Sequence, residues 1–289
     1  MRHVDLPILG NLERFGDAPA LLSKDASLTH AELAEAADEV AGSWGAGRHL
    51  VLIACTNSIE SIVALVATLR HGHAAIMVPA ASDELVEHIA EVHQPDILVT
   101  EGAVRVLADS APAMHPDLAL LLLTSGTTGS SKLVRLSRRN LSSVVASIRE
   151  YLAITAADRA ITSLPLCFSY GLSVVTTHLE SGASIVVTGD SAADPCFWEL
   201  AAEKRITSMA GVPYTFELID HGGFELPDSL RYVTIAGGRS SVEAVGRRVD
   251  QGRETGFEVV LMYGATEASA RMTYVPPAML DSAMDAIGQ

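Results

Sequence analysis

Apolar runs of strand length alternate with segments of helical periodicity along the chain, and this alternation limits the fold more than any other feature of the sequence. Thr29 stands three residues before Glu32, which is the spacing of a capping box, and predicts that a helix begins there and continues to about residue 44. Strands are expected at 50–54, 75–78, 97–100 and 118–124, with further helices at 59–69 and 83–92. Strands and helices in this order predict a parallel sheet covered by helices.

The same alternation returns in the second half of the chain. Helices are expected at 141–152, 172–180, 197–204 and 242–251, and strands at 160–164, 184–188, 208–212, 231–236 and 258–263. The predicted fold class is therefore α/β, with two lobes of mainly parallel sheets flanked by helices. The first lobe is expected to cover about residues 1–155 and the second about residues 156–289.

Charge and cysteine usage narrow the function classes. The 289 residues carry 20 Lys and Arg against 35 Asp and Glu, a net charge of −15 that argues against a nucleic-acid partner. The three cysteines, Cys55, Cys167 and Cys196, form no CxxC pair, which is typical of reduced thiols in a cytoplasmic protein. The longest apolar runs are only of strand length, so neither a membrane span nor a signal peptide is expected.

The segment 124–132, Thr-Ser-Gly-Thr-Thr-Gly-Ser-Ser-Lys, has the composition of an anion-binding loop. Its glycines allow backbone N–H groups to turn toward a ligand, its hydroxyl groups can donate to phosphate oxygens, and Lys132 adds a positive charge. It is not a Walker A loop, because only two residues separate Gly126 from Gly129 and Leu133 follows the lysine, which disfavours a P-loop NTPase. Since 132–136 has a strand pattern, the loop is expected to join two strands. On composition alone, a polar surface turn fits equally well.

Four segments, in order, resemble the motifs of the adenylate-forming superfamily, which comprises acyl-CoA synthetases, peptide-synthetase adenylation domains and luciferases. They are the loop at 124–132, Leu-Pro-Leu-Cys-Phe-Ser-Tyr-Gly at 164–171, Ala-Gly-Gly-Arg-Ser at 236–240 and Tyr-Gly-Ala-Thr-Glu at 263–267. The resemblance runs from about Thr29 to the end of the chain. It implies the fold of the family's N-terminal AMP-binding domain.

The resemblance also implies a nucleotide site. The residues that would bind ATP are Thr124, Ser125, Gly126, Thr127, Thr128, Gly129, Lys132, Gly238, Arg239, Ser240, Tyr263, Gly264 and Thr266. The implied catalytic residues are Lys132, Thr266 and Glu267. Glu267 would hold Mg²⁺ between phosphate oxygens, a role that suits a lone carboxylate. An isolated Tyr at a strand end is more often a core residue, and a lone loop Glu is more often only solvated. The motif that contains Tyr263 and Glu267 favours the functional interpretation.

The resemblance places the substrate acid in a pocket lined by Phe168, Ser169, Tyr170, Gly171 and Gly237. Many acyl-CoA ligases have a His where this chain has Phe168. Members that activate amino acids place an Asp near this motif, and none lies between residues 161 and 171. A carboxylic acid other than an α-amino acid is therefore expected, because a buried α-ammonium without a partner is costly.

The implied function is ATP-dependent activation of a small-molecule carboxylic acid to its acyl-adenylate, as in an acid–thiol ligase. Transfer to CoA or to the phosphopantetheinyl thiol of a carrier protein would follow. In the family the chain continues into a β-barrel subdomain and a mobile C-terminal domain with a catalytic Lys, and these have no counterpart in the 289 residues. The isolated chain is therefore expected to be poorly active and to need a separate C-terminal fragment. The alternative is a non-catalytic remnant that binds ATP or an acyl ligand and acts as a scaffold or regulator.

Overall fold

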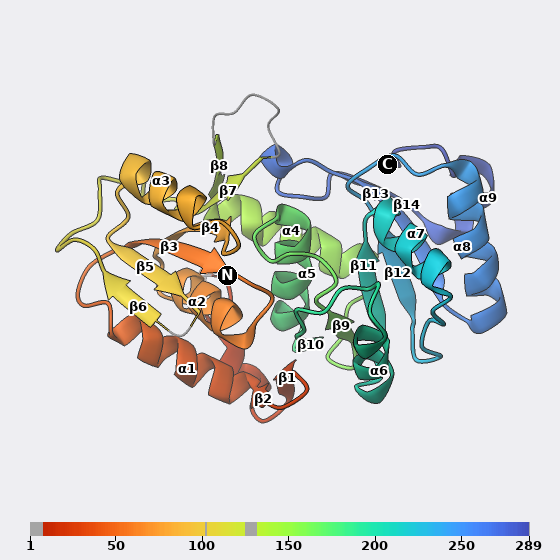
Figure 1. Cartoon of the computed structure of the whole chain (residues 1–289), viewed down its shortest axis with the longest axis horizontal. Helices are drawn as coiled ribbons and strands as arrows, with labels where there is room; N and C mark the ends of the chain where they lie inside the picture. The colour runs from red at the N-terminus through yellow and green to blue at the C-terminus, as the bar shows by residue number, and fades with distance from the viewer. Residues whose placement is uncertain (1–7, 102, 125–131, 289) are drawn as a thin grey trace, which may run out of the picture.

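The computed structural model of the chain describes residues 8–101, 103–124 and 132–288. Within these residues the backbone forms two β-sheets, and helices lie between the sheets and on their outer faces (Figure 1). The mixed α/β architecture predicted from the alternating sequence pattern is confirmed.

The six-stranded sheet has the order β6-β5-β3-β4-β7-β8. Its strands are β3 (Leu50–Cys55), β4 (Ala74–Pro79), β5 (Ile97–Thr100), β6 (Ala103–Val106), β7 (Leu118–Leu123) and β8 (Leu133–Ser137). The four inner strands pair in parallel, whereas β6 and β8 are antiparallel edge strands. Every residue of β3 is buried, which explains its unbroken apolar sequence.

The eight-stranded sheet has the order β14-β13-β12-β11-β9-β10-β1-β2. Its strands are β1 (Pro19–Leu22), β2 (Ser27–Thr29), β9 (Arg159–Ile161), β10 (Ser184–Val186), β11 (Ser208–Gly211), β12 (Tyr232–Ile235), β13 (Glu258–Tyr263) and β14 (Thr273–Val275). The strands from β13 to β10 are parallel, and β1 extends this parallel arrangement by pairing with β10. Residues from the start of the chain thus complete the sheet formed by its second half.

A central layer of helices packs against both sheets. α1 (His30–Gly42) begins at the predicted capping box, in which the Glu32 N–H donates to Thr29 Oγ1 at 3.1 Å and the Thr29 N–H donates to the Glu32 carboxylate at 2.8 Å. α2 (Ile59–Arg70) is buried from Ser61 to Leu69, as expected for a helix that is apolar on all sides. α4 (Arg138–Tyr151) and α5 (Ser169–Glu180) lie at the middle of the molecule (Figure 1). One hydrophobic cluster joins these helices to strands of both sheets.

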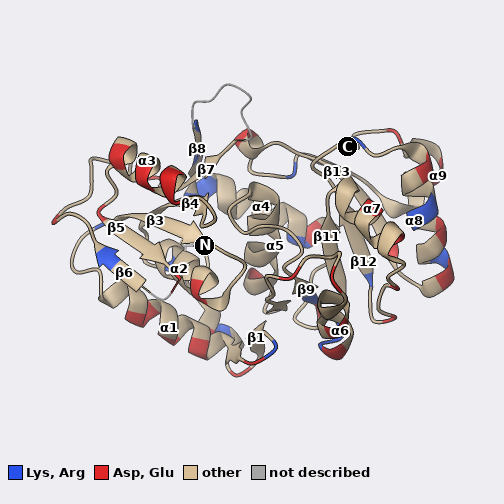
Figure 2. Ribbon diagram, in the orientation of Figure 1, with Lys and Arg blue, Asp and Glu red and all other residues tan. Residues whose placement is uncertain are grey.

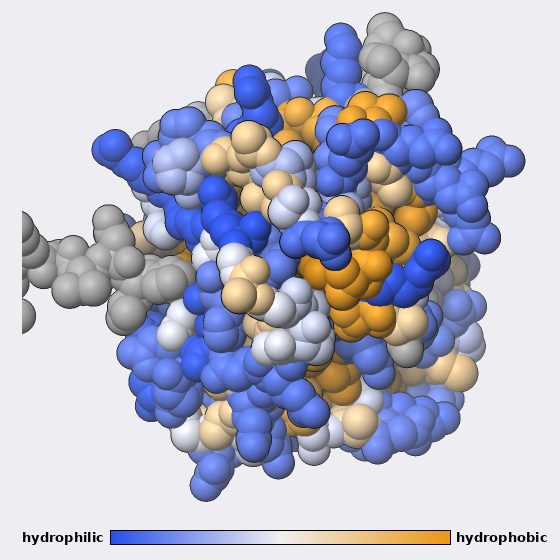
Figure 3. Space-filling view, turned by 90° about the vertical axis from the view of Figure 1, so that its left-hand side faces the viewer, coloured by the Kyte–Doolittle hydropathy of each residue, from blue (hydrophilic) through white to orange (hydrophobic). Residues whose placement is uncertain are grey.

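The remaining helices cover the outer faces. α3 (Asp83–His93) packs on the six-stranded sheet, and α6 (Pro195–Glu203), α7 (Pro213–Gly222), α8 (Val242–Thr255) and α9 (Leu280–Ala283) pack on the eight-stranded one. Beyond α3, strand β6 exposes Val104 and Val106 at the end of the molecule where Figure 3 shows an apolar patch. Among the described helices, none is both long enough and apolar enough to cross a bilayer.

The sheet topology brings three of the four motifs together. Because β9, β11, β12 and β13 are parallel, the loops that follow them start at one edge of the sheet. The β7–β8 hairpin of the other sheet reaches the same region, since β8 contacts the short helix η2 (Thr266–Ala268). The predicted junction between two strands on either side of residues 124–132 is confirmed by the antiparallel pairing of β7 with β8.

Candidate functional site

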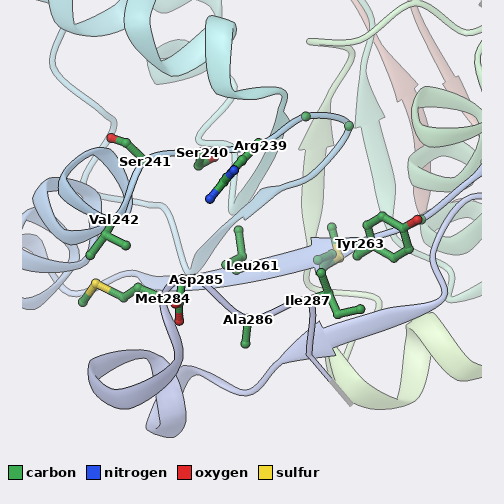
Figure 4. A pocket seen from close by; sticks show the side chains of 14 residues that line it. Arg239, Ser240, Ser241, Val242, Leu261, Tyr263, Met284, Asp285, Ala286 and Ile287 are labelled. Carbon is green, nitrogen blue, oxygen red and sulfur yellow. The ribbon is translucent and has the colours of Figure 1, made fainter.

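Two adjoining cavities open at the carboxyl edge of the eight-stranded sheet. The first cavity, of about 710 Å³, is lined by Thr124, Leu164, Pro165, Phe168, Ser169, Tyr170, Gly171, Val212, Ala236, Gly237, Gly264, Ala265, Thr266, Glu267 and Ala270. The second cavity, of about 960 Å³, is lined by Gly237, Gly238, Arg239, Ser240, Ser241, Val242, Leu261, Met262, Tyr263, Gly264, Met284, Asp285, Ala286 and Ile287 (Figure 4). Gly237 and Gly264 line both cavities, so a ligand could extend from one into the other.

The segment 164–171 is held in place from the opposite sheet. Asn57, just beyond the end of β3, donates from Nδ2 to the carbonyl oxygens of Thr162 and Leu164, each at 3.2 Å. Its Oδ1 accepts the N–H of Leu166 at 3.0 Å. Gly171 allows the segment to turn closely into α5, because a Cβ there would lie 2.4 Å from the Pro165 carbonyl oxygen. The wall of the first cavity is therefore fixed by a side chain outside the motif.

Within this segment the side chains lie in different surroundings. Phe168 precedes α5 and is 45% exposed, which places it at the rim of the first cavity. Ser169 Oγ lies 3.2 Å from Thr266 Oγ1 and thereby links the segment to the loop after β13. The Tyr170 hydroxyl hydrogen-bonds Thr234 Oγ1 at 2.7 Å. Burial raises the pKa of the Tyr170 phenol, so this side chain is neutral at physiological pH.

The loop after β13 is a tight turn. The Met272 N–H donates to the Tyr263 carbonyl oxygen at 2.9 Å, and the Ala270 N–H donates to the Ala265 carbonyl oxygen at 3.1 Å. Gly264 is the residue that permits this closure, since a Cβ at that position would lie 1.4 Å from the Ala270 carbonyl oxygen. Tyr263 is 46% exposed although the four residues before it are buried, so its ring faces the second cavity and is not part of the core.

The turn after β12 forms the opposite wall of the second cavity. Gly237 has a φ of +82°, a conformation that L side chains rarely adopt, and a Cβ there would lie 3.0 Å from a methyl group of Val212. Arg239 extends from this turn toward β13 (Figure 4). Ser240 Oγ is buried and has no hydrogen-bond partner among the described residues. The turn thus offers one cation, Arg239, to a ligand in the second cavity.

Two residues of the phosphate loop are described, Thr124 and Lys132. The Thr124 N–H donates to the Lys132 carbonyl oxygen at 3.4 Å across the open end of the hairpin. Thr124 lines the first cavity together with Thr266 and Glu267, and Lys132 is exposed. Ser125, Gly126, Thr127, Thr128 and Gly129 lie outside the described residues.

Glu267 is the single charged residue among the described residues that line the first cavity. It is exposed and stands next to Thr266, at the end of the cavity formed by the loop after β13. Elsewhere in the described ranges, His, Cys, Asp and Glu side chains form no cluster of three that could hold a metal by themselves. One accessible carboxylate beside hydroxyl groups fits a Mg²⁺ ion that takes its other ligands from phosphates and water.

The structure brings together the predicted residues of the segments 164–171, 236–240 and 263–267 around the two cavities. Sequence reasoning missed Asn57, Thr234 and Arg271, each of which holds a lining residue in position. Asn57 lies just after the carboxyl end of a predicted buried strand. Because functional residues often lie at the carboxyl ends of parallel strands, this position is a signal by which Asn57 could have been predicted. Thr234 and Arg271 carry no comparable signal, because their partners are distant in sequence.

The chain is similar to known proteins over most of its length. The model of the family described as AMP-binding enzyme matches residues 10–115 and 108–289. Tyrocidine synthase 3 of Brevibacillus parabrevis is 25% identical over 295 residues, covering 91% of this chain and 4% of that protein.

Two solved structures share the fold. The o-succinylbenzoate CoA synthetase from Bacillus subtilis, in complex with the acyl-adenylate intermediate OSB-AMP, superposes with a TM-score of 0.80 at 22% identity, over 98% of this chain and 63% of that one. A long-chain-fatty-acid-CoA ligase from Archaeoglobus fulgidus gives a TM-score of 0.83 at 18% identity, over 98% of this chain and 69% of that one. The chain thus spans 4% of the tyrocidine synthase and 63% of the CoA synthetase.

Proposed function

The chain belongs to the AMP-binding enzyme family, within the adenylate-forming superfamily, and on that premise we propose that it binds ATP and a carboxylic acid and activates the acid as its acyl-adenylate. The observation that carries the proposal is the shared boundary of the two cavities at Gly237 and Gly264. An acid in the first cavity and a nucleotide in the second would meet beside Thr266 and Glu267.

The motif residues have separate roles in this proposal. Tyr263, Gly238 and Arg239 bind the adenine, and Thr266 donates to the α-phosphate. The hydroxyl groups of Thr124, Ser125, Thr127 and Thr128, together with Lys132, bind the phosphates that leave as pyrophosphate. When bound at Glu267, Mg²⁺ neutralises phosphate charge. Because a carboxylate must approach a phosphate of like charge, neutralisation and positioning supply most of the rate enhancement.

The lining of the first cavity supports a substrate class. Its described side chains are apolar or neutral except for Glu267, which stands at the end assigned to the phosphates. Ser169 and Tyr170 offer an α-ammonium no charge, and burying an unpaired ammonium is costly. The proposed substrate is therefore a carboxylic acid with an uncharged tail and not an α-amino acid.

CoA or a carrier-protein thiol is the proposed acceptor of the acyl group. The free thiols of all three cysteines favour the cytoplasm as the place of action.

The experiment that tests the function is ATP–pyrophosphate exchange across a panel of simple carboxylic acids and amino acids. It is run with the chain alone and with a C-terminal fragment of a relative added. Exchange that depends on a simple acid supports the proposal. Nucleotide binding without exchange in either condition would instead support a non-catalytic binding protein, and exchange that depends only on amino acids would contradict the substrate class.

Lys132→Ala tests the phosphate site directly. Loss of a charge-assisted hydrogen bond should weaken Mg·ATP binding by about 1–3 kcal/mol, measured by calorimetry. The melting temperature should hardly change, because Lys132 is exposed. Lys24→Ala removes an equally exposed charge from the turn between β1 and β2 and is the matched control. Equal ATP affinities in the two variants would contradict the assignment of Lys132.

A further inference from the structure

Tyr170 closes the first cavity on its interior side. The cavity lies at the carboxyl edge of the sheet, where its lining residue Ala236 directly follows β12. The Tyr170 hydroxyl hydrogen-bonds Thr234, which lies within β12, two residues before Ala236. Thr234 is only 2% exposed, so the phenol points away from the cavity mouth and toward the core. The Tyr170 ring therefore stands across the space between α5 and β12.

Arg271 contacts one face of the same ring. The guanidinium carbon lies 5.0 Å from the centre of the Tyr170 ring, a cation–π contact. The Arg271 Nε–H donates to Ser173 Oγ at 3.0 Å, and the Ser173 hydroxyl donates in turn to the Tyr170 carbonyl oxygen at 2.7 Å. The ring is thus held at its hydroxyl by Thr234 and across its face by Arg271.

Core residues fill the region on the far side of Tyr170. Tyr170 packs at the margin of a hydrophobic cluster that contains Ile148, Tyr232, Val260 and Met262. Neither Thr234 nor Arg271 lines the cavity, although each contacts the lining residue Tyr170. Among the lining residues, Tyr170 thus separates the first cavity from this cluster, and its two contacts restrict rotation of the ring.

We propose that Tyr170, positioned by Thr234 and Arg271, sets the depth of the acyl cavity and restricts the enzyme to short carboxylic acids. The proposal rests on the function proposed above and names the property of the acid that the site selects. Tyr170 is a specificity-determining residue, because its ring is where the end of a longer acyl chain would collide. Thr234 and Arg271 are positioning residues that act through it.

The test uses stable analogues of the acyl-adenylate, in which an acylsulfamoyl group is joined to adenosine and carries straight chains of two to ten carbons. Their dissociation constants are measured by calorimetry. For the parent chain, affinity should rise with the first methylenes and then fall sharply. For Tyr170→Ala it should continue to rise, by about fourfold for each further methylene that becomes buried. Tyr170→Phe retains the ring but loses the bond to Thr234, and Arg271→Met loses the contact to the ring face, so each should admit longer chains to a smaller extent than Tyr170→Ala.

Tyr151→Ala is the matched control. Tyr151 packs at the margin of the same cluster, stacks on Tyr274 at 4.2 Å and lines neither cavity. Its loss should lower the melting temperature without moving the cut-off. If Tyr170→Ala does not fold, Tyr170→Leu replaces it, with the cut-off expected to move by fewer carbons.

The outcomes separate the two proposals. A parent chain that binds neither the analogues nor AMP would overturn the proposed function and this inference with it. Nucleotide binding with the same length profile in the parent and the Tyr170 variants would overturn this inference alone.

Discussion

At the scale of single residues, the site depends on a few side chains and one glycine, each with a separate structural or chemical role. Gly264 allows the loop after β13 to close on itself, and Tyr263 turns an aromatic ring out of the core toward the second cavity. Glu267 is the acidic group that the described lining of the first cavity offers. Its proposed role as the Mg²⁺ ligand leads to a direct test.

Glu267→Gln keeps the shape of the side chain and removes its charge. Mg²⁺ should then improve ATP binding by about 1–3 kcal/mol less than it does for the parent chain, because a charged partner is lost. Calorimetric titrations with and without Mg²⁺ measure this difference. Glu254→Gln, on the exposed face of α8, removes the same charge outside both cavities and should behave as the parent. An unchanged Mg²⁺ dependence in Glu267→Gln would rule out the proposed role.

The motif residues could be predicted from the sequence, but the residues that hold them could not. A motif is a local string, and Tyr263 to Glu267 is recognised without knowledge of anything else. Arg271 and Thr234 matter only because Tyr170 lies between them. Such contacts join segments whose relative placement depends on the whole fold, so single polar residues gave no signal.

At the scale of elements, the predicted strands and helices are those with long apolar patterns, such as β3 and α2. The structure adds β1, β2, β6, β14, α7 and α9, which sequence analysis did not predict. The four strands have three or four residues each and lie at or near the edges of their sheets. A strand at a sheet edge is less covered by the rest of the protein, so its sequence need not show a long apolar pattern. The strand expected at 160–164 ends at Ile161, because Thr162 and Leu164 give their carbonyl groups to Asn57 and not to a neighbouring strand.

Asn57 connects the end of β3 to the segment before α5, and Asn57→Ala should disturb both stability and acid binding. Leu166, which is 2% exposed, would keep a backbone N–H without a partner, at a cost of about 1–3 kcal/mol. Chemical denaturation measures the stability, and calorimetry with an acyl-adenylate analogue measures binding.

Asn140→Ala is the comparison for this prediction. Asn140 belongs to the capping box of α4, so its loss should cost about 1 kcal/mol of stability. It lines neither cavity, and binding should remain as in the parent. Equal binding by the two Asn variants would show that Asn57 does not position the cavity wall.

At the scale of the whole molecule, acidic residues lie on the exposed faces of several helices while the core contains buried imidazoles. Figure 2 shows Asp and Glu along α1, α3 and α8. His73 and His178 are 6% and 2% exposed. Burial lowers the pKa of each of them to about 4, from an ordinary value near 6.5. The folded protein therefore keeps both imidazoles neutral at a pH where the unfolded chain protonates them.

Stability should accordingly be greatest above pH 6.5 and should decline between pH 6.5 and about 4. In this window the unfolded state binds more protons than the folded state, and each histidine contributes a slope of up to about 1.4 kcal/mol per pH unit. Urea denaturation at a series of pH values measures the slope. His73→Asn retains an acceptor for the His49 N–H, which donates to His73 Nδ1 at 3.0 Å, and should flatten the profile. His88→Asn, at an exposed position of α3, should not. A parental profile that is flat from pH 6.5 to 4 would contradict the prediction.

The pairing of β1 with β10 also fixes an order of events when the protein is made. Leu21 is paired with Ile185, and all six strands of the other sheet lie between them in the sequence. At 5–20 residues per second, a ribosome delivers β10 roughly ten to thirty seconds after β1. The six-stranded sheet can close during that interval. Throughout it, β1 in the nascent chain lacks the strand that covers one of its edges, and the backbone groups of that edge have no partner within the chain.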